Sequence, residues 1–131
     1  MENWVKLRHE CSPFVIFTKL RQGADADVRI RNELRKPNEQ VSFKIVTNGK
    51  SFAVLREGPP GICASVKFKW TESEISVQPE FSQSYQTFSR DPLRTTLTLT
   101  NEGDCKLKTG TEELTCCQFR KKVLEDLFFN F

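Results

Sequence analysis

The stretch A-S-V-K-F-K-W-T-E-S-E-I-S-V-Q-P, residues Ala64–Pro79, decides the fold. Apolar and polar residues alternate up to Trp70, four polar residues follow, and the alternation resumes at Ile75. Successive side chains of a β-strand point to opposite faces, so this pattern predicts a hairpin with one apolar face and one basic face. We expect Trp70 to be largely buried on the apolar face.

A second hairpin is predicted just before this stretch, around Asn48-Gly49. The runs on either side, Val41–Thr47 and Ser51–Arg56, both alternate between apolar and polar residues. Asn-Gly between two such runs is the strongest local hairpin signal, because both residues tolerate the positive φ angles of a tight turn. The break Gly58-Pro59-Pro60-Gly61 then separates the two hairpins.

The remaining runs rich in β-branched and aromatic residues are also interpreted as strands. We expect a polar loop at Gln22–Asp27, and a short helix is the alternative for Ile30–Arg35. The Ser/Gln-rich segment Glu80–Asp91 is either a loop that places its aromatic residues on the core or one helical turn. The strands expected are Trp4–His9 as an edge strand or terminal arm, Phe14–Leu20, Val28–Leu34, Leu93–Thr100 and Cys105–Lys108.

The end of the chain changes its period from two residues to three or four. This spacing predicts an amphipathic helix over about residues 112–129, beginning near Thr111 with acidic residues in its first turn. The alternative for Leu114–Cys117 is the end of a last strand. The apolar positions with helical spacing are Cys116, Phe119, Val123, Leu124, Leu127 and Phe128.

Taken together, these elements predict a single globular domain over residues 1–131. It is mainly β, an antiparallel sandwich or barrel-like domain with seven to nine short strands and one C-terminal helix, because a parallel sheet would need crossover helices. The apolar end Leu127–Phe131 either docks on the core or leads into a longer protein, of which this chain would be the N-terminal domain.

Composition and cysteine usage predict a location in the cytoplasm or nucleus. The formal net charge is only +3, and no apolar run reaches the length of a transmembrane segment. Met1–Glu10 carries charges and no apolar run follows it, so we expect no secretory signal. The five cysteines are odd in number and irregularly spaced, which favours free thiols, with Cys105 and Cys116 as small buried apolar residues.

No pattern in the sequence indicates catalysis, a cofactor or a metal ion. His9 is the only histidine, and the chain has no nucleophile elbow, no Gly-rich phosphate loop and no C-x-x-C pair. Cys116 and Cys117 are adjacent, so their side chains diverge and cannot readily bind one ion. We therefore expect a protein that is not an enzyme.

The C-terminal helix carries more apolar residues than one buried face needs. Such a surplus can bury a second surface, so the sequence favours a non-enzymatic intracellular protein-interaction module, a subunit or scaffold domain of a larger complex. The partner is another protein or a second copy, bound by helix docking or by strand addition at a sheet edge. The interaction residues expected are Phe119, Val123, Leu124, Leu127, Phe128 and Phe129.

The alternative function is phosphate binding, to nucleic acid or phosphoinositide, by a basic sheet face that includes Lys67 and Lys69. Lys19 is also followed, further along, by Arg29-x-Arg31. This spacing resembles the K-x(n)-K/R-x-R pattern of phosphoinositide-binding pleckstrin-homology domains, and the expected element order is similar to theirs. The resemblance implies that Lys19, Arg29 and Arg31 hold an inositol phosphate.

Overall fold

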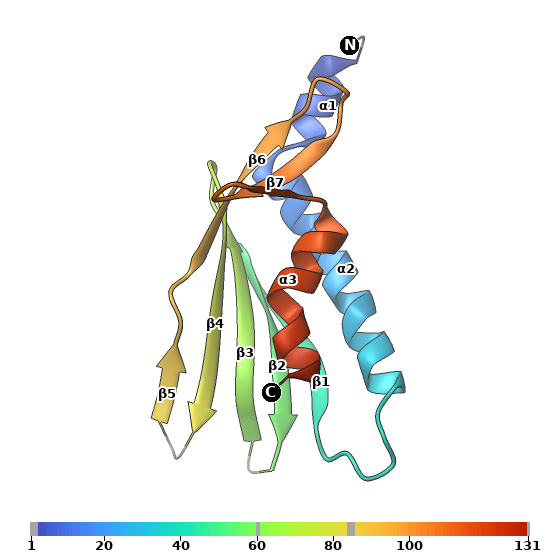
Figure 1. Cartoon of the computed structure of the whole chain (residues 1–131), viewed down its shortest axis with the longest axis vertical. Helices are drawn as coiled ribbons and strands as arrows, with labels where there is room; N and C mark the ends of the chain where they lie inside the picture. Colours follow the sequence, from blue (N-terminus) through green and yellow to red (C-terminus); the bar gives the residue numbers. More distant parts are fainter. Residues whose placement is uncertain (1–2, 60, 84–85, 131) are drawn as a thin grey trace.

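The computed structural model describes residues 3–59, 61–83 and 86–130 (Figure 1). Among these residues two helices come first, α1 (Trp4–Glu10) and α2 (Pro13–Glu33). Eight strands follow, and the helix α3 (Cys116–Phe129) comes last. The element order of pleckstrin-homology domains is not found, because α1 and α2 precede the first strand.

The described strands form an open antiparallel sheet in the order β1-β2-β3-β4-β6-β7-β8. The first residues of β4 pair with β6, and its last residues pair with β5. The prediction of a mainly β, antiparallel domain is confirmed, but the sheet does not close into a barrel, and helices form the layer that packs on it. The strands are β1 (Ser42–Asn48), β2 (Ser51–Gly58), β3 (Gly61–Trp70), β4 (Ile75–Gln83), β5 (Gln86–Ser89), β6 (Leu93–Leu99), β7 (Cys105–Thr109) and β8 (Glu112–Leu114).

Both predicted hairpins are confirmed. Trp70 pairs with Ile75 where β3 turns into β4. In the other hairpin Asn48 pairs with Ser51, and Gly49 in the turn has a φ of 59°, which glycine adopts without strain. Trp70 is half-buried rather than enclosed, because it lies near the end of the covered face.

The N-terminal strand predictions for Trp4–His9, Phe14–Leu20 and Val28–Leu34 are wrong, because α1 and α2 occupy these segments. The expected loop Gln22–Asp27 is also wrong, since it lies inside α2. The Ser12-Pro13 pair begins this helix. Proline has no N–H to donate, and the first helical turn is the place where none is needed.

The buried residues of α2 recur every three or four positions beyond the first two, which is the spacing of one helix face. The dense run at the start of α2 hides this period, because a continuous apolar run is compatible with a buried strand or a buried helix. The alternative of a helix at Ile30–Arg35 is confirmed in part, since α2 continues to Glu33. The buried residues of α2 are Ile16, Phe17, Leu20, Ala24 and Val28.

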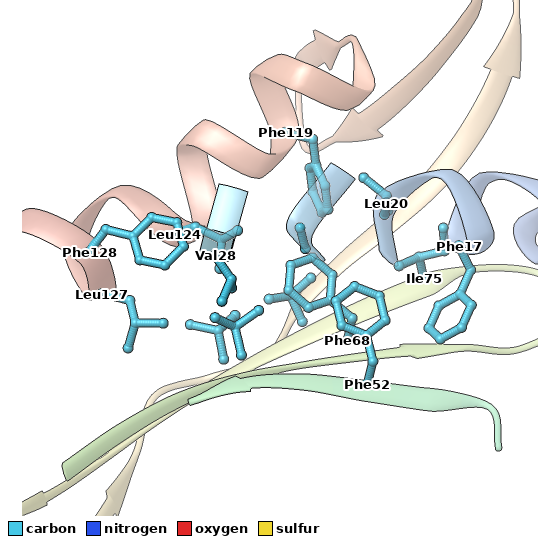
Figure 2. Close-up of a cluster of buried hydrophobic side chains, with 14 of the residues drawn as sticks. Phe17, Leu20, Val28, Phe52, Phe68, Ile75, Phe119, Leu124, Leu127 and Phe128 are labelled. Atoms are coloured by element: carbon cyan, nitrogen blue, oxygen red, sulfur yellow. The ribbon is translucent and has the colours of Figure 1, made fainter. Parts of the chain in front are cut away.

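The core lies between the sheet and the two long helices (Figure 2). The ring of Phe52 stacks on Phe68 with centroids 4.4 Å apart, and Phe119 of α3 meets Phe68 edge-on at 6.5 Å. Full burial of a phenylalanine contributes roughly 1.5–3 kcal/mol, so these contacts between helix and sheet are a main source of stability.

Helix α3 begins at Cys116, about four residues later than predicted. The side chain of Thr115 accepts a hydrogen bond from the backbone N–H of Gln118 at 3.2 Å, and the Gln118 side chain accepts one from the Thr115 N–H at 3.0 Å. This reciprocal capping fixes the start of the helix. The residues before it form β8, so the alternative of a last strand over Leu114–Cys117 is confirmed for Leu114 and wrong for Cys116 and Cys117, which begin α3.

The segment Glu80–Asp91 is neither a loop nor a helical turn in its described part. Strand β4 continues to Gln83, and β5 returns beside it. Phe81 and Phe88 face each other across the two strands and stack with ring centroids 5.2 Å apart.

Hairpin β6–β7 projects beside α1 at the end of the molecule that carries the N-terminus (Figure 1). A disulfide joins Cys11, between α1 and α2, to Cys105 at the start of β7. The prediction of free thiols is therefore wrong for these two residues. The thiols of Cys63, Cys116 and Cys117 are free.

Candidate functional site

A groove of about 490 Å³ runs between the C-terminal half of α2 and the length of α3. Three large apolar side chains on its walls are exposed: Ile30 at 54%, Leu34 at 64% and Phe129 at 65%. Leu124 and Phe128 of α3 are buried beneath them. We call this surface the helix seam. Large apolar side chains clustered over a groove are typical of a binding surface, whereas single exposed ones are not.

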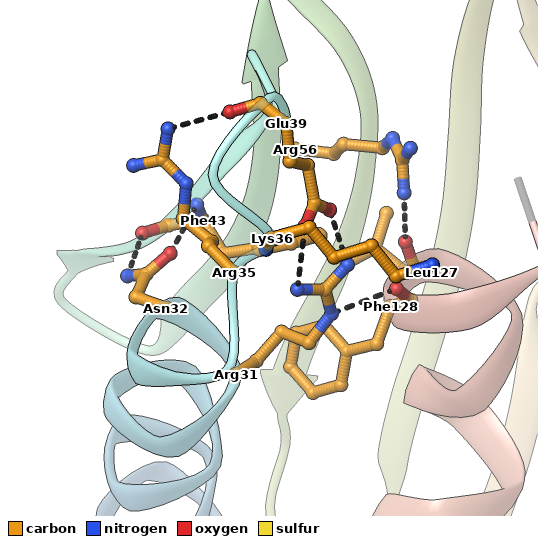
Figure 3. Close-up of polar contacts among 9 residues, drawn as sticks. All are labelled: Arg31, Asn32, Arg35, Lys36, Glu39, Phe43, Arg56, Leu127 and Phe128. Carbon is orange, nitrogen blue, oxygen red and sulfur yellow. Dashed lines mark hydrogen bonds and ion pairs between the residues drawn. The ribbon is translucent and has the colours of Figure 1, made fainter.

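Arg31 of α2 lines the seam and connects α2 to the end of α3 and to Glu39 (Figure 3). Its Nε donates a hydrogen bond to the backbone carbonyl of Phe128 at 3.0 Å, and its Nη2 lies 2.5 Å from a carboxylate oxygen of Glu39. The guanidinium also lies 4.9 Å from the ring centroid of Phe43 and 5.3 Å from that of Phe129. Hydrogen bonding to Arg31, and secondarily to the Lys36 N–H, holds the pKa of Glu39 below its ordinary value.

A second arginine holds the same end of α3. Arg56 of β2 donates from Nη1 to the backbone carbonyl of Leu127 at 2.9 Å (Figure 3). The last carbonyls of a helix have no partner within the helix, and cationic donors stabilise them by hydrogen bonding and by the helix dipole. The position of Phe129 at the seam is therefore fixed by contacts from α2 and from the sheet.

The charged groups along the seam are paired with one another. Arg120 Nε lies 2.8 Å from the carboxylate of Asp27, and Lys121 lies 3.2 Å from Glu125 on the next turn of α3. Gly23 lets the guanidinium of Arg120 lie against α2, because a Cβ at that position would be 2.3 Å from its Nη1. A partner could therefore bury the apolar side chains Ile30, Leu34 and Phe129 without breaking an ion pair.

The predicted interaction residues of α3 divide between core and surface. Phe119, Leu124, Leu127 and Phe128 are buried in the core and contact α2 or the sheet rather than solvent (Figure 2). Val123 is half-buried and lines a second groove of about 340 Å³, between α3 and strands β3 and β4. Of the six residues, Phe129 is the one with a largely exposed side chain.

The sequence reasoning missed Ile30 and Leu34, which form the other wall of the seam. They are four residues apart, so they lie one above the other on a helix. The signal was present, but it required reading residues 28–34 as helix rather than strand.

The candidate phosphate-binding residues do not gather at one site. Arg31 is held in the contacts below the seam, and Arg29 is paired with Asp25 at 3.2 Å. Lys19 is an exposed residue of α2. Lys67 and Lys69 lie on the opposite face of the sheet, because the alternating residues of β3 between them face the core.

Cys116 and Cys117 lie at the start of α3 in different surroundings. Cys116 is half-buried, and this burial raises the pKa of its thiol, although the nearby cations Lys19 and Arg120 partly oppose the effect. Cys117 is exposed at the helix seam.

Within the described ranges, no group of three or more His, Cys, Asp or Glu residues could hold a metal ion. No helix of this part of the chain is long and apolar enough to cross a membrane. No family model matches the chain, and neither a curated protein nor a solved structure is similar to it.

Proposed function

We propose that this chain is a non-enzymatic protein-interaction module, a subunit or scaffold domain of a larger complex, and that the helix seam is its docking surface. The observation that supports this is the exposure of Ile30, Leu34 and Phe129 around one groove. Each has more than half of its side chain in water, so burial would contribute roughly 1–2 kcal/mol per residue.

The partner is best described as an amphipathic helix that presents its apolar face. The seam is a groove between two helices, and the ridge of a third helix fits such a groove with anchors at helical spacing. The ion pairs beside it are already satisfied, so affinity should depend weakly on salt.

The experiment is quantitative affinity capture from cells with matched variants of the bait. Leu34→Asp and Phe129→Asp place a charge at the seam, and Val5→Asp is the control, because Val5 is equally exposed at 65% but lies on α1. The proposal expects proteins that are lost with both seam variants and kept with the control. Proteins captured equally by all four baits, or lost with all three variants, would contradict it.

The second candidate is a phosphate-binding surface on the outer face of the sheet. Lys69 of β3 lies in register with Ser76 of β4, and Ser76 lies in register with Arg94 of β6. In the described part of the chain no ion pair is formed by Lys67, Lys69 or Arg94. The favoured cations are therefore Lys67, Lys69 and Arg94 in place of Lys19, Arg29 and Arg31.

A salt titration separates the two candidates. Binding of single-stranded DNA or of phosphoinositide vesicles should weaken steeply with added salt and be lost in a Lys67→Glu, Lys69→Glu double variant. Binding to neither probe, or binding that the double variant leaves unchanged, would remove this candidate.

We propose cytoplasm or nucleus as the location, in line with the three free thiols. The Cys11–Cys105 disulfide instead favours an oxidising compartment, because structural disulfides are rare in reducing ones. Thiol counting on protein trapped directly from cells decides between them: five reactive thiols would support the proposed location, and three would favour an oxidising one.

A further inference from the structure

Strand β1 is the last strand on one side of the sheet, and its outer edge lies next to α2. Among the described residues it pairs with β2 alone. A groove of about 350 Å³ lies along this edge, lined by Arg21, Gln22 and Asp25 of α2 and by Ile45 and Thr47 of β1.

The side chain of Asn32 shows which backbone groups point out of this edge (Figure 3). Its Nδ2 donates to the carbonyl of Phe43 at 2.8 Å, and its Oδ1 accepts from the Phe43 N–H at 2.9 Å. The amide thus occupies the place of a residue in a neighbouring strand. In an antiparallel sheet the groups that point to one side alternate along the strand, so the N–H and C=O of Ile45 and Thr47 also point outward.

The usable edge is short and has defined ends. Asn32 covers Phe43 at one end, and the turn at Gly49 and Lys50 ends the strand at the other. Two residues remain, with two donors and two acceptors. Open strand edges of this kind are ready to pair with another strand.

We propose that the edge of β1 binds the same edge of a second copy of this chain, antiparallel, with Ile45 of each copy opposite Thr47 of the other. This register forms four backbone hydrogen bonds. Pairing Ile45 with Ile45 instead would place Thr47 opposite Phe43, which Asn32 already satisfies, and would leave only two hydrogen bonds.

The charges beside the edge are complementary in such a dimer. Arg21 and Asp25 are one turn apart on α2, at the groove, and Asp25 also pairs with Arg29 of its own helix at 3.2 Å. The two-fold axis reverses the direction of the second helix, so each Arg21 comes to lie toward the Asp25 of the other copy. Lys44 on the strand itself is neutralised by Glu57 at 2.8 Å, so it adds no repulsion.

Val46 supports the same arrangement. It is 45% exposed and points to the sheet face that the helices leave open. In the proposed register the two-fold axis passes between the two Val46 residues. They form a pair without direct backbone hydrogen bonds, and in such pairs the two side chains approach most closely. The dimer leaves the helix seam free, so this proposal and the proposed function can fail independently.

The first test is the dimerisation constant of the whole chain by analytical ultracentrifugation. Thr47→Pro removes the N–H that the edge needs, and Thr47→Ala is the matched control that keeps it. We expect a wild-type dimer, a dissociation constant raised about 10- to 100-fold by Thr47→Pro, and little change with Thr47→Ala. A wild-type monomer at the highest soluble concentration would overturn the proposal, as would equal effects of the two variants.

The second test does not depend on whether the proline variant folds. Val46→Cys places two thiols on the axis, and oxidised glutathione joins them in a disulfide while it is itself reduced to the thiol. Lys44→Cys is the control, since residue 44 faces Asn48 of the other copy. Cross-linking through position 46, located by peptide mass, supports the register. Cross-linking that is absent, or equal at position 44, refutes it.

Discussion

The disulfide between Cys11 and Cys105 should be worth several kcal/mol, and removing it is the sharpest test of the fold. The bond closes a loop with a sequence separation of 94 residues. Loop-closure entropy for this length corresponds to about 4.7 kcal/mol at 25 °C, an upper value because unfolded chains keep some structure. Helix α1 has no buried residue of its own, so this bond is the main link between the end of α1 and the sheet.

The assay compares chemical unfolding of the wild type with that of a Cys11→Ala, Cys105→Ala double variant. We expect the free energy of unfolding to fall by roughly 3–5 kcal/mol and the melting temperature by more than about 10 °C. The control is Cys117→Ala, which removes an exposed free thiol and should leave both quantities unchanged. Equal stability of wild type and double variant, or five alkylatable thiols in the oxidised protein, would refute the reasoning.

Three further predictions concern the ends of α3. Arg31→Ala should lower the free energy of unfolding by roughly 2–3 kcal/mol in urea, because it leaves a helix-end carbonyl without its cationic donor. The control Arg29→Ala removes only an exposed ion pair and should lower it by less than about 0.5 kcal/mol. The pKa of Glu39 is lowered in the folded state, so its contribution to stability is present above its ordinary value of 4.5 and is lost as pH falls through the folded-state value. The stability gap between wild type and Glu39→Gln should therefore shrink on acidification, and a gap that widens would show that the sign is wrong. Because burial raises the pKa of Cys116, iodoacetamide at pH 8 should modify Cys117 first, and peptide mapping measures the order.

The sequence predicted the hairpins well because their signals are local. Asn48-Gly49 fixes a turn by the backbone freedom of two residues, and alternation fixes the faces of the flanking strands. The same reasoning failed for α2. Its first turn places Phe14 through Phe17 in one apolar run, and the helical period becomes visible only when Ala24 and Val28 are counted with it.

The candidate site was predicted only in part because it depends on distant residues. The surplus apolar character of α3 did identify Phe129, but Leu124 and Phe128 proved to be core, since the burial of a helix face depends on what packs against it. Ile30 joins Phe129 at one groove from the far side of the sequence. No spacing rule links positions so far apart.

The two arginines that hold the end of α3 join parts of the chain that the ribosome makes at different times. Arg31 is separated from Phe128 by 97 residues, so a ribosome needs about 5–20 s to make the second after the first. During this interval α2 and the first hairpin have left the ribosome, while the helix that covers Phe68 has not been made. The nascent chain therefore carries for seconds an apolar sheet face that α3 does not yet cover, which is long enough for a chaperone to bind it before α3 closes the core.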